Sequence, residues 1–122
     1  MKVINIPVKP RGKGSVRGGN GGFFKDKATK EYMSKVEYFI RKDWQEEPLE
    51  CPVSIKVCFS FVGDTSKYVS KKPDIDNCLK ALLDCGTGII WKDDCQIVEL
   101  YAEKVFSEIS EGTIILIEEK ND

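Results

Sequence analysis

Residues 71–96, KKPDIDNCLKALLDCGTGIIWKDDCQ, carry most of the information on how this chain folds and what it does. Two aspartates spaced two apart, Asp74 and Asp76, stand near the start of the stretch, and a second pair, Asp93 and Asp94, stands near its end. Between the pairs, apolar residues recur at helical spacing and glycines follow, so the chain should form a short helix and fold back. Carboxylates that meet from two such elements would suit a hard metal ion.

The helix is predicted to begin at Pro73, because proline is favoured at a first helical position, and to stop at Gly86 and Gly88. The apolar stripe that should face the core consists of Ile75, Leu79, Leu82 and Leu83. A second line along the helix is polar and consists of Asp76, Lys80 and Asp84.

Periodicity elsewhere predicts one further helix and four strands. The expected elements are a strand at 3–8, a loop rich in Gly, Lys and Arg at 9–22, a helix at 28–44, an alternating strand at 53–61, and strands at 96–106 and 113–118. We expect the last two strands to pair antiparallel across residues 107–112. This order predicts an α+β fold in a small single domain spanning residues 1–122, with a mixed sheet and two helices packed on it.

Composition excludes several kinds of chemistry. The 122 residues include no histidine, which removes Ser-His nucleophiles and the usual zinc ligand. The five cysteines form no Cys-x-x-Cys pair, so they are expected to be reduced and packed as small hydrophobes. No apolar run is long enough to span a bilayer and no signal peptide is evident, so no membrane partner and a cytoplasmic location are expected.

Charge is distributed unevenly along a nearly neutral chain. Residues 1–30 carry eight Lys and Arg against one Asp, whereas the net charge of the whole chain is −1. A basic arm of this kind is compatible with contacts to a phosphate backbone. It is equally compatible with a solvated loop, and composition alone leaves both interpretations open.

The acidic stretch also has two interpretations. Carboxylates, waters and a phosphate oxygen could complete the shell of a magnesium ion, with manganese as a substitute, and Lys80 could stabilise charge on a phosphate. However, an aspartate near a helix start complements the helix dipole, an Asp-Asp pair often forms a turn, and Lys80 could simply pair with Asp76 or Asp84. The chemistry of the residues leaves both interpretations open.

The runs KPDIDNCLKALLD and GIIWKDDCQIVE resemble the signature of RusA-type Holliday-junction endonucleases from bacteria and phages. That signature is Asp-x-Asp-Asn-x-x-Lys on a helix, followed at this distance by Asp-Asp-x-Gln. The resemblance covers nearly the whole chain. It implies a RusA-like fold and a magnesium-dependent endodeoxyribonuclease. The resemblance further implies that the enzyme is a homodimer, which resolves four-way DNA junctions by paired symmetric nicks in DNA recombination and repair.

The resemblance also assigns roles to residues. Asp74, Asp76 and Asp94 match the metal-binding carboxylates, and together with Lys80 they are the implied catalytic set. Asn77 and Asp93 are expected to support the metal ligands. The expected DNA-binding residues are Arg11, Lys13, Arg17, Lys71 and Lys72.

Two rival functions remain to be weighed. A non-catalytic phage-type DNA-binding module would have no need for this combination of carboxylates and lysine. A phosphohydrolase for small molecules is disfavoured because GGNGG, at residues 18–22, lacks the lysine and helix of a phosphate-binding loop, so no nucleotide cofactor is expected. Exposed apolar residues on an edge strand or on the basic arm are the expected homodimer interface.

Overall fold

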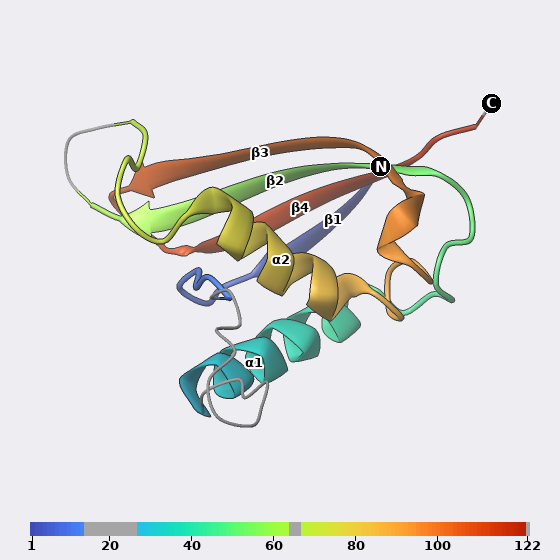
Figure 1. Cartoon of the computed structure of the whole chain (residues 1–122), viewed down its shortest axis with the longest axis horizontal. Helices are drawn as coiled ribbons and strands as arrows, with labels where there is room; N and C mark the ends of the chain where they lie inside the picture. Colours follow the sequence, from blue (N-terminus) through green and yellow to red (C-terminus); the bar gives the residue numbers. More distant parts are fainter. Residues whose placement is uncertain (14–26, 64–66, 122) are drawn as a thin grey trace, which may run out of the picture.

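The structure is a computed structural model that describes residues 1–13, 27–63 and 67–121. Its elements in chain order are β1 (Lys2–Ile6), α1 (Lys27–Asp43), β2 (Val53–Val62), α2 (Ile75–Gly86), the 3-10 turn η1 (Asp94–Gln96), β3 (Ile97–Ser107) and β4 (Gly112–Glu119). Within these residues the strands form one four-stranded mixed sheet, and both helices pack on the same face of it (Figure 1). The predicted α+β fold is confirmed.

The sheet has the order β1-β4-β2-β3, which corrects one expectation. The last two strands were predicted to pair with each other, but β2 lies between them. It pairs parallel with β3 and antiparallel with β4. The physical reason is the crossover through α2: a strand, a helix and a second strand bring the chain back parallel to the first strand. Helix α2 therefore runs opposite to β2 and β3.

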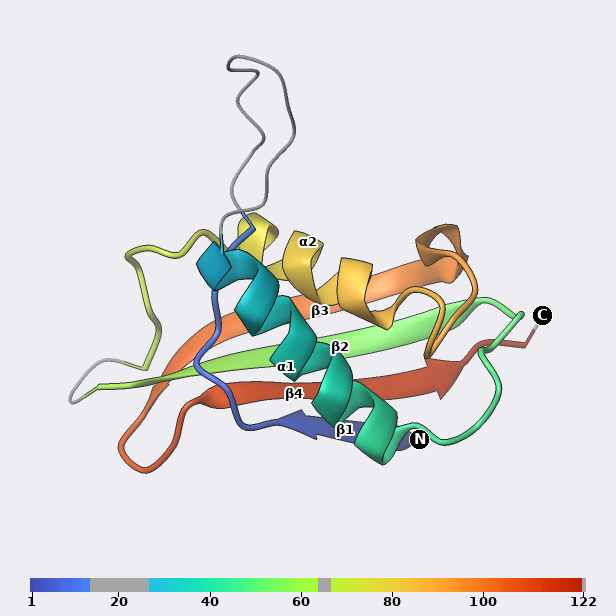
Figure 2. The same ribbon diagram turned by 90° about the horizontal axis from the view of Figure 1, so that it is seen from below.

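The core lies between the sheet and the helices. The predicted alternation in β2 is confirmed, because its inward side chains are all buried: Val53, Ile55, Val57, Phe59 and Phe61. From α1, Val36 and Ile40 are fully buried against this face. Figure 2 shows the two helices lying across the sheet from below.

Helix α2 is rotated relative to the predicted stripe. Its buried residues are Cys78, Ala81, Leu82, Cys85 and Gly86. Three of the four predicted core positions, Ile75, Leu79 and Leu83, are only half-buried. Small side chains on the inner face allow the close approach: a Cβ atom on Gly86 would lie 2.9 Å from the Trp91 ring. The helix ends at Gly86, as the glycines predicted.

Candidate active site

Asp74 stands at the N-cap of α2, at the end of the sheet where β2 and β3 finish (Figure 1). This corrects the predicted start of the helix. Pro73 follows a cis peptide bond and precedes the cap, Asp74 has an extended backbone, and the helix begins at Ile75. An N-cap aspartate usually accepts a hydrogen bond from the first turn, but the Asp74 side chain accepts none there. Its carboxylate is therefore not used to cap the helix.

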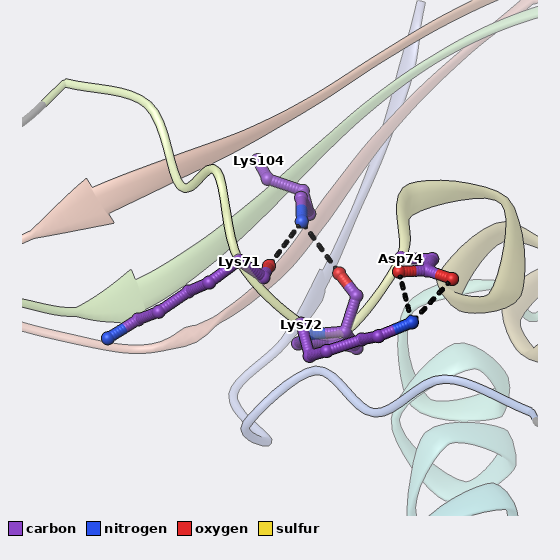
Figure 3. A network of polar contacts seen from close by, with 5 residues as sticks. Lys71, Lys72, Asp74 and Lys104 are labelled. Carbon is purple, nitrogen blue, oxygen red and sulfur yellow. Dashed lines mark hydrogen bonds and ion pairs between the residues drawn. The ribbon is translucent and has the colours of Figure 1, made fainter.

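Both oxygens of the Asp74 carboxylate instead accept hydrogen bonds from the ammonium group of Lys72. The Lys72 Nζ atom lies 2.9 Å from Oδ1 and 3.0 Å from Oδ2 (Figure 3). The Lys72 side chain is 84% exposed, so the pair is screened by solvent and contributes little to stability. A divalent cation could replace the ammonium group at low cost.

Lys104 on β3 anchors the turn that leads to Asp74, and sequence reasoning missed it. Its ammonium group donates hydrogen bonds to the backbone carbonyls of Lys71, at 2.8 Å, and Pro73, at 2.6 Å (Figure 3). Lys104 pairs in the sheet with buried Phe59. The available signal was the alternation of Leu100, Ala102, Lys104 and Phe106, in which a lysine occupies an apolar position. A charged group there needs polar partners, and the turn supplies them.

Further along α2 lie Asp76, Asn77 and Lys80. Asp76 is exposed in the first turn, and Lys80 is exposed one turn later. Among the described residues, no ion pair joins Lys80 to Asp76 or Asp84; the Asp84 carboxylate is bound by Lys13 at 2.5 Å. The backbone carbonyl of Asn77 accepts a hydrogen bond from the Lys13 N–H at 3.0 Å.

Asp93 and Asp94 lie at the other end of α2, where β3 begins (Figure 1). The two acidic pairs therefore do not meet within one chain, because α2 runs opposite to β3. The turn before Asp74 contacts Lys104, seven residues into β3 from Ile97, and seven strand residues span about 23 Å. Within the part of the chain that the structure describes, no three carboxylate or thiol groups lie close enough to share a metal ion.

Asp93 has a local role in this turn. Its carboxylate accepts a hydrogen bond from the Cys95 N–H at 3.0 Å, and its own N–H donates to the Gln96 side chain at 2.9 Å. The bonds from Cys95 hold the pKa of Asp93 below its usual range. Gln96 also donates to the backbone carbonyls of Leu49 and Cys51, which fixes the turn against the preceding loop. Asp94, in contrast, is exposed.

A comparison with protein-family models matches residues 5–118 to "Endodeoxyribonuclease RusA". The chain belongs to the RusA family. A curated relative is "Uncharacterized protein YqaN" of Bacillus subtilis (strain 168), which is 29% identical over 123 residues, or 87% of this chain and 86% of the relative. RusA proteins are metal-dependent endodeoxyribonucleases that bind and resolve Holliday junctions in DNA recombination and repair.

The residues at the start of α2 fit the metal that a RusA enzyme requires. Magnesium is commonly held by one or two carboxylates, with waters and phosphate oxygens filling the remaining positions. Asp74 and Asp76 offer two carboxylates within three residues, and neither carboxylate is buried. They could supply two of the oxygen ligands of a hard cation, and waters, phosphate oxygens or a further carboxylate could fill the remaining positions.

The predicted DNA-binding residues of this RusA protein differ in their surroundings. Arg11 and Lys72 line one hollow beside the site. Lys71 lies near the surface with its ammonium 5.9 Å from the Phe106 ring centre, whereas the ammonium of Lys13 is held by Asp84. Arg17 lies outside the described residues. Among those residues, no helix is both long and apolar enough to cross a membrane.

Proposed function

We propose that this RusA protein is a magnesium-dependent Holliday-junction resolvase, active also with manganese, that cuts by paired symmetric nicks. The observation that carries the proposal is the Asp74 carboxylate, which stands at a helix start without capping it. Asp74 and Asp76 would hold the cation. When bound, the metal supplies an activated water and neutralises charge on the scissile phosphate. The bacterial relative supports a bacterial or phage origin, with action in the cytoplasm.

The chain's own residues supply orientation and charge. Lys104 fixes the two carbonyls before Asp74, so the metal ligand is held on a defined turn. Lys80, one helical turn beyond Asp76, directs its ammonium group to charge that develops on the phosphate. Lys72 would be free to contact DNA if a cation were bound at Asp74. The backbone carbonyl of Asn77 holds the Lys13 N–H. Asp93 holds the turn before β3 through Cys95 and Gln96.

Asp94 enters the site from a second copy of the chain. Within one chain, β3 separates it from Asp74 by about 23 Å, so it reaches a cation at Asp74 only across a dimer interface. Strand β3 is an edge strand that begins at Ile97, just after the turn that contains Asp94, and it carries half-exposed apolar residues, namely Val98, Leu100 and Tyr101. In a two-fold dimer each copy gives Asp94 to the other, and two equivalent sites result.

Mixed dimers of two inactive variants test this arrangement. Asp74→Asn and Asp94→Asn proteins are purified separately, and each is expected to be inactive on a synthetic four-way junction with magnesium. When they are mixed and allowed to exchange subunits, about half of the dimers are mixed. With shared sites, each mixed dimer holds one intact pair of Asp74 and Asp94, so about a quarter of the wild-type sites is restored.

The control is a mixture of Asp74→Asn with Asp76→Asn. Both changes lie in the same half of the site, so no mixed dimer contains an intact site and activity stays absent. If the Asp74→Asn and Asp94→Asn mixture also stays inactive although native mass spectrometry detects mixed dimers, the shared site is wrong. Wild-type protein that leaves the junction intact with magnesium or manganese present would overturn the proposed function itself.

A further inference from the structure

A hollow of about 550 Å³ lies beside the start of α2, on the side of α1. Its walls come from the segment after β1, the first half of α1, and the turn before Asp74. This volume falls in the range of pockets that bind small organic groups, which is about 300–1,000 Å³. The sequence indicated a basic loop in this region but gave no sign of a hollow.

The charges around the hollow favour an anion. Among the described residues that line it, one is acidic, Glu31, and four are cationic: Lys9, Arg11, Lys35 and Lys72. The formal sum of these five side chains is about +3, and it falls to about +2 when the Asp74 carboxylate that binds Lys72 is included. Lys9 and Lys35 are both exposed at its rim. Neither lysine was predicted to bind DNA. Lys35 belongs to α1, and the sequence gave no reason to place it near Asp74.

The floor of the hollow is apolar and uncharged. Tyr32 is only 6% exposed, and burial raises the pKa of its hydroxyl to about 12, so it stays neutral at physiological pH. Pro10 is buried beside it, and Val8 and Pro73 are half-buried. A cationic rim above an apolar floor fits a ligand that has a phosphate and a less polar body, such as one nucleotide unit.

Lys72 connects the hollow to the candidate metal ligand. It lines the hollow, and its ammonium group reaches the Asp74 carboxylate at 2.9 Å. An occupant of the hollow therefore lies within one lysine side chain of Asp74. On a continuous DNA strand, that distance corresponds to a nucleotide next to the phosphate held at Asp74.

We propose that this hollow is a subsite for one nucleotide of the cleaved strand, adjacent to the scissile phosphate, and that Lys9 and Lys35 contact its phosphate. The proposal rests on the proposed function, because it assumes that the scissile phosphate lies at Asp74. It adds two DNA contacts and makes the hollow a determinant of how the strand is aligned for cutting.

The test removes positive charge from the protein and, separately, negative charge from single phosphates of the DNA. Lys9→Ala/Lys35→Ala is compared with Lys30→Ala/Lys42→Ala, which removes the same charge from exposed α1 positions that do not line the hollow. Junctions carry a single neutral methylphosphonate at successive positions around the cut. Binding is measured in EDTA, so that no cleavage occurs, and circular dichroism verifies that both variants fold.

At one or two positions next to the cut, the neutral linkage should weaken binding of the wild type and of the Lys30/Lys42 control by about fivefold to tenfold. For the Lys9/Lys35 variant the same linkage should cost less than about twofold, because the contact is already lost. The salt dependence of binding should also flatten by about one unit of slope in this variant alone. Equal responses of both double variants at every position would overturn the subsite.

This outcome is separable from the proposed function. Cleavage of the unmodified junction by the wild type with magnesium is scored on its own. A protein that cleaves, but in which the neutral linkage has the same effect on the wild type and on the Lys9/Lys35 variant at every position, lacks the subsite. A protein that does not cleave, but in which the neutral linkage costs less in the Lys9/Lys35 variant than in the wild type, has the subsite without the enzymatic activity.

Discussion

Replacing Lys104 with methionine should weaken metal use more than DNA binding. Methionine keeps the length and apolar stem of the side chain but removes both hydrogen bonds to the turn, at 2.8 and 2.6 Å. Hydrogen bonds from a charged donor contribute about 1.5–3 kcal/mol each. The Lys71 carbonyl lies at an exposed position, where water replaces the lost donor, so the partly buried bond to Pro73 accounts for most of the loss.

The expected cost is about 2 kcal/mol, and its effect is local. Two backbone bonds still hold the same segment to β3: Val69 N–H to the Lys104 carbonyl and Phe106 N–H to the Lys67 carbonyl, at 3.1 and 3.0 Å. The turn at 71–73 would then leave its position for part of the time. Because apparent affinity falls with the populated fraction of the competent state, half-saturation by magnesium should rise by up to about thirtyfold.

Single-turnover cleavage of a synthetic junction over a magnesium series measures this effect, and urea unfolding measures the free energy of unfolding. Lys56→Met is the matched control, because Lys56 is an exposed lysine on the neighbouring strand β2. It should change neither quantity. If Lys104→Met loses stability but keeps the wild-type magnesium dependence, Lys104 only supports the fold, and the reasoning about Asp74 is refuted.

Three further predictions concern the site and the core. Asp74→Asn and Asp76→Asn should each abolish cleavage yet bind the junction at least as tightly in gel-shift assays, because they remove negative charge near DNA; near-normal cleavage would remove that residue from the metal shell. Lys80→Ala should slow single-turnover cleavage about a hundredfold with magnesium affinity unchanged, and a loss below about threefold would exclude a contact to the phosphate. Ile90→Ala, at a fully buried position, should lower the free energy of unfolding by about 2–5 kcal/mol in urea titrations, whereas a change under about 1 kcal/mol would mean that the core closes around the gap.

Sequence reasoning predicted those elements that depend on local pattern. The alternation in residues 53–61 places each inward side chain of β2 in the core, and both helices lie within a few residues of their predicted bounds. The rotation of α2 was missed because its inner face consists largely of Cys78, Ala81 and Cys85. These residues are small, so a pattern of large apolar residues gave the stripe to their neighbours.

Long-range features were less accessible. The position of β2 between β3 and β4 depends on a crossover that no local period encodes, although the strand-helix-strand order could have suggested a parallel pair. The same topology separates Asp94 from Asp74. The sequence indicates that Asp74 lies near a helix start and Asp94 near a turn before a strand, but it does not give the distance between them. The role of Lys104 escaped prediction because its partners are backbone carbonyls, which carry no residue identity.

Helix α2 acts as a spacer of fixed length between the two acidic pairs. Its twelve residues span about 18 Å, and a rigid element of this length cannot bend to bring Asp94 to Asp74. Under the proposed shared site, a single chain lacks the complete set of metal ligands, so its nuclease activity should rise with the square of protein concentration when the protein is dilute. In a cell, such a site would delay strand breakage until enough protein has accumulated.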